Sequence, residues 1–131
     1  MVLVDTSIWI QSTNQKDGLE ANELDALLAR DEVATTEIVI AEVLQGTMTE
    51  RDFAQYSDKM EALRCLPATK DTWVKAAELS FRLRRRGLTT PLTDLVVATV
   101  AIENEIAVYA KDQHFERIPG LKLHEPESSN R

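Results

Sequence analysis

The feature that most constrains the fold is an alternation between short apolar runs and longer segments with helical spacing. The chain opens with "MVLVDTSIWI", in which Val2–Val4 have the length and apolar character of a buried strand. Similar short runs follow at Val33–Thr35 and Ile106–Ala110, and "LKLHE" near the end is a fourth candidate strand. Strands that are separated by helices predict an α/β sandwich with a mainly parallel central sheet.

Helical patterns fill the space between the candidate strands. The segments are "LEANELDALLARDE", "EIVIAEVLQG", "TERDFAQYSDKMEALRC", "DTWVKAAELSFRLRRRG" and "DLVVATVAIENE". The last segment is apolar nearly all round, so we expect a buried helix there. Trp9 and Trp73 are expected in the core rather than on a base-stacking surface.

Length and composition predict one domain over residues 1–125, followed by a flexible tail over 126–131. No apolar run approaches the roughly 20 residues that span a bilayer, and no basic leader precedes an apolar stretch, so we expect a cytoplasmic protein with no membrane association. A single cysteine, Cys65, excludes an internal disulfide framework. The net charge of −7 argues against broad, nonspecific binding along nucleic acid. It does not exclude nucleic acid that binds through a local basic patch.

Four carboxylates stand in apolar surroundings. Asp5 ends the first strand, Glu42 interrupts "IVIAEVL", Asp94 opens the most apolar helix, and Asp112 follows "IAVYA" by one residue. The carboxyl ends of parallel strands share one edge of a sheet, where functional sites gather. We therefore expect Asp5 and Asp112 to meet at that edge, with the helix start at Asp94 pointing toward it.

Each carboxylate also has a purely structural explanation. Asp5 and Asp112 suit a turn or a helix N-cap. Asp94 would complement the dipole of its helix. Glu42 is harder to explain on an apolar face, although Gln45 on the same side could mark a wet edge.

Taken together, the four carboxylates predict a cation site. Two carboxylates ~4 Å apart repel each other by roughly 4 kcal/mol at an effective dielectric constant near 20. Protonation or a bound metal relieves that repulsion. A site rich in oxygen ligands suits Mg²⁺ or Mn²⁺, and such ions activate water for phosphoryl displacement.

The chain resembles the PIN-domain ribonucleases, in particular the VapC-type toxins of toxin–antitoxin pairs. The segments that carry the resemblance are "VLVDTSIWI", "IVIAEVLQG" and "PLTDLVVATVAIENEIAVYAKDQHFERIPGLKL". The last is the most specific, because acid, small-residue helix, strand, acid and "HFERIPGLKL" follow the order and spacing of the family. The resemblance extends to about Glu125.

The resemblance implies a PIN-like three-layer sandwich and a Mg²⁺-dependent endoribonuclease, with Mn²⁺ as a substitute. It also implies a structured RNA substrate of the transfer or ribosomal class, a cognate antitoxin that neutralises the activity, and a homodimer. The residues that match the family's catalytic and metal-binding acids are Asp5, Glu42, Asp94 and Asp112. Ser7 matches a supporting hydroxyl.

One position departs from the family. Members usually carry Thr or Ser two residues before the fourth acid, where this chain has Ala110. An alternative function follows from that departure, namely a catalytically impaired binding module that acts through assembly with an antitoxin. A second alternative, an aspartyl-phosphate receiver or phosphatase that uses Asp5, lacks the second Asp two residues on and leaves Glu42 unexplained.

Basic residues and histidines complete the candidates. Arg84, Arg85 and Arg86 of "RLRRRG", together with Lys111, are candidate RNA contacts. A solvated helix end is the slightly favoured explanation of the arginines, and a plain surface position explains Lys111 equally well. The two histidines and one cysteine do not form a zinc ligand set. Ser7 with His114 would suggest a nucleophile and base, but no third residue supports the pair. We therefore interpret His114 as a surface or packing residue.

Overall fold

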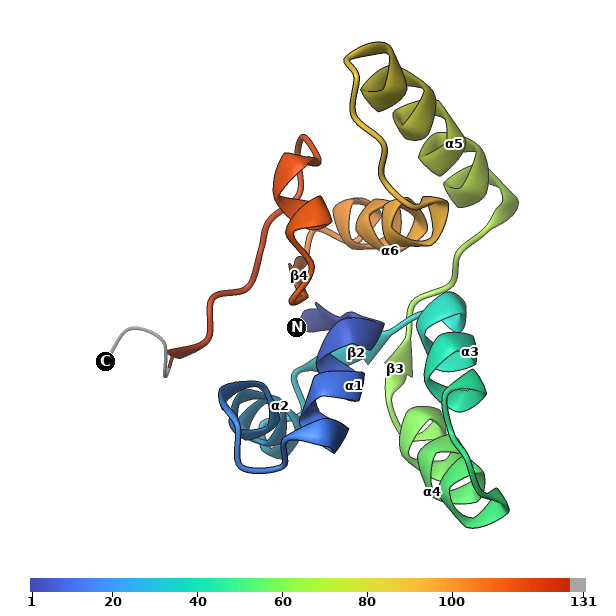
Figure 1. The fold of residues 1–131 in the computed structure, drawn as a ribbon. Coiled ribbons are helices and arrows are strands. Elements are labelled where there is room, and N and C mark those ends of the chain that lie inside the picture. Colours follow the sequence, from blue (N-terminus) through green and yellow to red (C-terminus); the bar gives the residue numbers. More distant parts are fainter. Residues whose placement is uncertain (128–131) are drawn as a thin grey trace.

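The computed structural model of the chain describes residues 1–127. The elements, most of which are labelled in Figure 1, are β1 (Val2–Val4), α1 (Thr6–Asn14), α2 (Leu19–Ala29), β2 (Val33–Thr35), α3 (Glu37–Gln45), α4 (Glu50–Glu61), β3 (Arg64–Cys65), α5 (Lys70–Arg85), α6 (Leu92–Glu103), β4 (Ala107–Tyr109) and the 3₁₀ helix η1 (Gln113–Arg117). Residues 128–131 of the predicted flexible tail lie outside the described part of the chain.

A four-stranded parallel sheet forms the centre, in the order β3-β2-β1-β4. The chain steps from β1 outward to β3 and then returns across the sheet to β4. Because parallel crossovers are right-handed, that return places its helices on the opposite face. Figure 1 shows α5 and α6 on one side of the sheet and α1, α2 and α4 on the other. The predicted α/β sandwich with its parallel central sheet is confirmed.

Helix α6 is the most deeply buried helix of the described chain, as its all-round apolar sequence predicts. Every residue from Leu95 to Ala101 is buried. The helix packs between α5 and the sheet, where it fixes Asp94 in its first turn. Burial of this segment therefore positions one of the four acids.

Three short elements depart from the sequence prediction. Strand β3 falls where we expected the end of a helix, because "RC" offers no apolar or β-branched run. Helix α1 has no counterpart among the predicted helices, since its β-branched and aromatic residues favour strands. The predicted strand "LKLHE" makes only a single bridge, Leu123 to Val108. Pro126 follows closely and cannot continue strand pairing.

The expectation that Trp73 belongs to the core is wrong. Trp9 is 2% exposed and lies in the core as expected, whereas Trp73 is 40% exposed. The side of α5 that carries Trp73 also carries the exposed Phe81, and it faces the solvent. The buried side carries Thr72, whose hydroxyl donates to Glu103 of α6 at 2.8 Å, and Leu83. A polar tie to α6 thus fixes the rotation of α5.

Within residues 1–127, no helix has the length and apolar character that crossing a membrane requires.

Candidate metal centre

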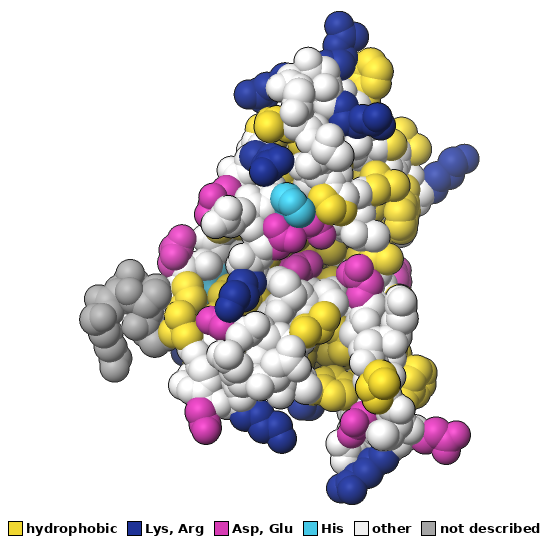
Figure 2. Space-filling view, viewed as in Figure 1, with side chains coloured by type: hydrophobic (Ala, Val, Ile, Leu, Met, Phe, Trp, Pro, Cys, Tyr) yellow, Lys and Arg dark blue, Asp and Glu magenta, His cyan; other side chains and the backbone are white. Residues whose placement is uncertain are grey.

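The pairing of β1 with β4 brings two strand ends together at the carboxyl edge of the sheet. Val4 pairs with Tyr109, and the Asp5 N–H donates to the Tyr109 carbonyl at 2.9 Å. Asp5 therefore leaves β1 beside the point where the chain leaves β4 toward Asp112. Figure 2 shows acidic side chains gathered in the middle of the corresponding face, with a histidine beside them.

Asp5 is both a helix cap and a buried charge. Its Oδ2 accepts hydrogen bonds from the Ser7 backbone N–H at 3.1 Å and from the Ser7 hydroxyl at 2.7 Å, which caps α1. The residue is only 5% exposed. Burial raises the pKa of Asp5 above its usual value, the bonds from Ser7 oppose that shift, and the charge of Asp112 adds to it. Asp5 can thus serve both as the N-cap of α1 and as a residue of the site.

Ser7 connects the two strand ends. Its hydroxyl donates to Asp5 and accepts the backbone N–H of Lys111 at 3.0 Å. One side chain thereby fixes the Asp5 carboxylate relative to the segment that leads to Asp112. The supporting role that the sequence assigns to Ser7 stays a prediction, and this geometry is consistent with it.

The carboxyl pKa of Asp94 is shifted further from its usual value than that of Asp5. Burial is the largest cause that raises its pKa, from 3.8 to about 6, and the charges of Asp5 and Asp112 add to it. The hydrogen bond and charge of His114 act in the opposite direction. These effects show that Asp5, Asp94 and Asp112 share one electrostatic environment.

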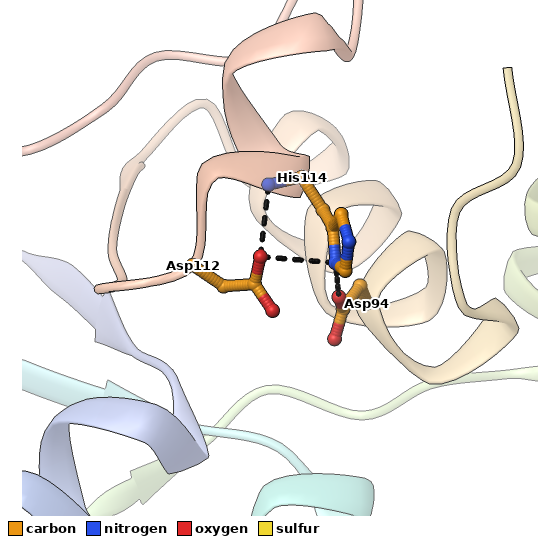
Figure 3. A group of neighbouring side chains, drawn as sticks. All are labelled: Asp94, Asp112 and His114. Atoms are coloured by element: carbon orange, nitrogen blue, oxygen red, sulfur yellow. Dashed lines mark hydrogen bonds and ion pairs between the residues drawn. The ribbon is translucent and has the colours of Figure 1, made fainter.

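Asp112 and His114 lie opposite Asp94 and face it (Figure 3). Asp112 caps η1 by accepting the His114 backbone N–H on Oδ1 at 2.9 Å. The His114 ring then lies over both acids, with Nδ1 2.9 Å from Asp112 Oδ1 and 3.3 Å from Asp94 Oδ2. One ligand atom from each of the three residues lies within 4.8 Å of the other two.

His114 is the site residue that the sequence interpretation missed. We placed it at the surface or in packing, whereas the structure places its ring between two of the four acids. The signal was its position two residues after Asp112, since a capped turn that starts at Asp112 folds the two side chains together.

Glu42 stands at the rim of this group. Its Oε1 accepts the hydroxyl of Thr6, the neighbour of Asp5, at 2.8 Å. That bond directs the Glu42 carboxylate toward the start of α1, although Glu42 is not part of the tight Asp94, Asp112 and His114 cluster. Sequence reasoning named all four acids. The structure places Asp5, Asp94 and Asp112 in one electrostatic environment, and it bonds Glu42 to Thr6, the residue that follows Asp5.

The donor set fits a divalent cation. Three carboxylates share the site, and the pKa of Asp94 is raised first by its burial and then by the neighbouring charges of Asp5 and Asp112. The Ser7 N–H donates to Oδ2 of Asp5, the His114 N–H donates to Oδ1 of Asp112, and the His114 ring nitrogen Nδ1 lies beside Oδ2 of Asp94. Carboxylate oxygens are the ligands that Mg²⁺ and Mn²⁺ prefer.

The candidate RNA contacts fall into two places. Arg84, Arg85 and Arg86 are exposed at the end of α5, where the Arg85 guanidinium lies 5.6 Å from the Phe81 ring centroid. Figure 2 shows basic side chains at that end of the face, apart from the acidic group. Lys111 lies beside the site, and its Nζ is 3.3 Å from Glu20 Oε1. The structure therefore places Lys111 nearer to the acids than the arginines.

A family model described as the PIN domain matches residues 2–121, so the chain belongs to the PIN-domain family. Among curated proteins it is similar to Ribonuclease VapC2 of Rickettsia felis, with 29% identity over 126 residues that cover 92% of this chain and 94% of that protein. Ribonuclease VapC5 of Mycobacterium tuberculosis is 28% identical over 124 residues, 90% of this chain and 87% of that protein.

Solved structures show the same fold. VapBC2 from Rickettsia felis, bound to a promoter DNA fragment, has a TM-score of 0.78 and 24% identity and covers 95% of this chain and 98% of its own. VapC20 of Mycobacterium tuberculosis, described as a toxin that cleaves the sarcin–ricin loop, has a TM-score of 0.73 and 19% identity, with 95% and 100% coverage. The predicted resemblance to VapC-type PIN domains is confirmed.

The raised pKa of Asp94 predicts a pH-dependent penalty in the metal-free protein. Because the folded-state pKa of about 6 exceeds the usual 3.8, the penalty grows as the pH rises from about 4 to about 6 and persists above that. We expect Asp94→Asn to raise the free energy of unfolding by on the order of 1–3 kcal/mol near pH 8 and by almost nothing near pH 4. Urea denaturation in a chelator measures the difference.

Asp58→Asn, at an exposed acid of α4, is the control for this measurement. Destabilisation by Asp94→Asn at pH 8, or an equal effect at both pH values, would contradict the electrostatic account.

Proposed function

We propose that the chain is a divalent-metal-dependent endoribonuclease toxin that hydrolyses phosphodiester bonds in structured RNA of the transfer or ribosomal class. The observation that carries the proposal is the convergence of Asp5, Asp94 and Asp112 at the sheet edge, where burial raises the pKa of Asp94 and the charges of Asp5 and Asp112 raise it further. The curated relatives named as VapC ribonucleases support the RNA substrate. We propose that one domain over residues 1–125 carries the activity in the cytoplasm.

The proposed roles follow from the geometry. Asp5, Glu42, Asp94 and Asp112 would hold Mg²⁺, or Mn²⁺ as a substitute. When bound, the ion supplies activation of water and stabilisation of the charge on the leaving oxygen. Ser7 holds the Asp5 carboxylate in place, and the Thr6 hydroxyl orients Glu42. Burial of Asp5 excludes water from one side of the site.

RNA contacts are proposed for Lys111 and for Arg84, Arg85 and Arg86. Lys111 would exchange its ion pair with Glu20 for a phosphate. Lys111 is the exposed partner of that pair, with 54% of its side chain accessible against 16% for Glu20. The three arginines at the end of α5 would hold a more distant part of the RNA backbone. These positive side chains compensate locally for the acidic net charge of −7.

We also propose a cognate antitoxin and a homodimer as partners. The support for the antitoxin is the fold shared with VapBC complexes from Salmonella typhimurium and nontypeable Haemophilus influenzae. The support for the homodimer is the family resemblance in the sequence. An antitoxin would keep the nuclease inactive until it is removed.

Metal-dependent cleavage is the direct test of the proposed activity. Wild-type protein, freed of any antitoxin, is expected to cut a pool of cellular RNA at discrete sites with Mg²⁺ or Mn²⁺ and not with chelator. Asp5→Asn should lose at least about 100-fold of the rate, since it removes a charge that holds the ion. The products should carry 3′-hydroxyl and 5′-phosphate ends.

Asp58→Asn is the matched control and should cut like the wild type. Products with 2′,3′-cyclic phosphate ends would contradict the mechanism, because they would mean that the 2′-hydroxyl of the RNA attacked.

A catalytically impaired binding module is the second candidate, and Ala110 is the observation that favours it. The missing hydroxyl matters only if nothing else orients Asp112. The His114 backbone N–H already binds Asp112 Oδ1, and Ser7 holds the neighbouring Lys111 N–H. These bonds favour the active enzyme.

Ala110→Thr separates the two candidates, with Ala110→Val as a control of similar shape that lacks the hydroxyl. We expect the two variants to cleave RNA at rates within about threefold of each other, or ~0.7 kcal/mol. A gain of about 100-fold that is confined to the Thr variant would favour the impaired module.

A further inference from the structure

We propose that His114 is a nitrogen ligand of the metal centre and makes the site prefer Mn²⁺ over Mg²⁺. This inference rests on the proposed metal-dependent function and concerns which ion the site takes. It assigns a role to a residue outside the four acids.

The positions of the three side chains carry the inference. His114 Nδ1 lies 2.9 Å from Asp112 Oδ1 and 3.3 Å from Asp94 Oδ2 (Figure 3). Neighbouring ligands of an octahedral ion at about 2.1 Å lie roughly 3 Å apart. The nitrogen therefore has the spacing of an adjacent ligand from each of the two oxygens, and all three atoms lie within 4.8 Å of one another.

Packing does not account for the place of the His114 ring. The ring belongs to a residue whose side chain is 36% exposed, so it fills no part of the core. The next residue, Phe115, is 1% exposed and anchors η1 in the core. The cap from Asp112 to the His114 N–H sets the start of η1. Phe115 and this cap together hold the imidazole over the acids.

The other histidine is occupied elsewhere. His124 Nε2 lies 2.6 Å from Glu23 Oε2, and its ring packs against Tyr109 at a centroid distance of 5.2 Å. His124 shares no contact with Asp94 or Asp112 among the described residues. The two histidines of the chain thus form a natural pair of test and control positions.

The chemistry of the ligand set gives the direction of the preference. Mg²⁺ binds oxygen ligands and water almost exclusively, whereas the divalent first-row ions, of which Mn²⁺ is the weakest binder, also accept nitrogen ligands. An imidazole that replaces one oxygen or water ligand therefore costs Mg²⁺ more than Mn²⁺. A carboxylate-rich site with one imidazole keeps enough hard ligands for Mn²⁺.

Electron spin-echo spectroscopy of Mn²⁺ bound to the whole protein tests the assignment directly, because a coordinated imidazole nitrogen couples to the electron spin. We expect strong ¹⁴N coupling in wild type and in His124→Gln, and none in His114→Gln. Calorimetric titration should show that His114→Gln lowers the Mn²⁺ affinity by about tenfold or more and the Mg²⁺ affinity by less than about threefold.

His114→Asp provides an all-oxygen site at the same position and should narrow the ratio of Mn²⁺ to Mg²⁺ affinity. Circular dichroism checks that each variant is folded. Mn²⁺ binding without nitrogen coupling in wild type, or coupling that persists in His114→Gln, would overturn the role of His114 and leave the metal centre intact. Failure of wild type to bind Mn²⁺ or Mg²⁺ would overturn the metal centre itself.

Discussion

The pairing of β1 with β4 is the interaction on which the site depends. The return of the chain across the sheet places β4 beside β1, and the Asp5 N–H continues the ladder to Tyr109. This register brings Asp5 close to the segment that carries Asp112. The apolar helix α6 packs on the same sheet and holds Asp94 in its first turn, at the same edge. A few buried backbone contacts thereby hold three like charges together.

Holding these charges together costs free energy, and the protein offsets the cost locally. Ser7 donates twice to Asp5, and the His114 backbone N–H donates to Asp112. These bonds stabilise the ionised forms, but burial still raises the pKa of Asp5 and of Asp94. A bound divalent cation would relieve the remaining repulsion, so the same feature that destabilises the metal-free protein favours metal binding.

The sequence predicted the layers of the sandwich and the four acids. It predicted less well which side of α5 faces the core and which side chains meet through short capped turns. Strands β1, β2 and β4 and the buried helix α6 were evident because their apolar patterns are continuous. Trp73 was misplaced because two faces of α5 carry apolar residues. The Thr72 bond to Glu103 and the burial of Ala76 and Leu83 select one of these faces. His114 was missed because its role depends on a cap between neighbours, which no apolar periodicity encodes.

Anomalous diffraction from crystals soaked in Mn²⁺ would test the central claim most directly, because it locates the ion without reference to activity. The account predicts a peak between Asp5, Asp94 and Asp112, at roughly 2.0–2.6 Å from carboxylate oxygens. The absence of a peak at this edge of the sheet, with Mn²⁺ bound elsewhere on the surface, would contradict it.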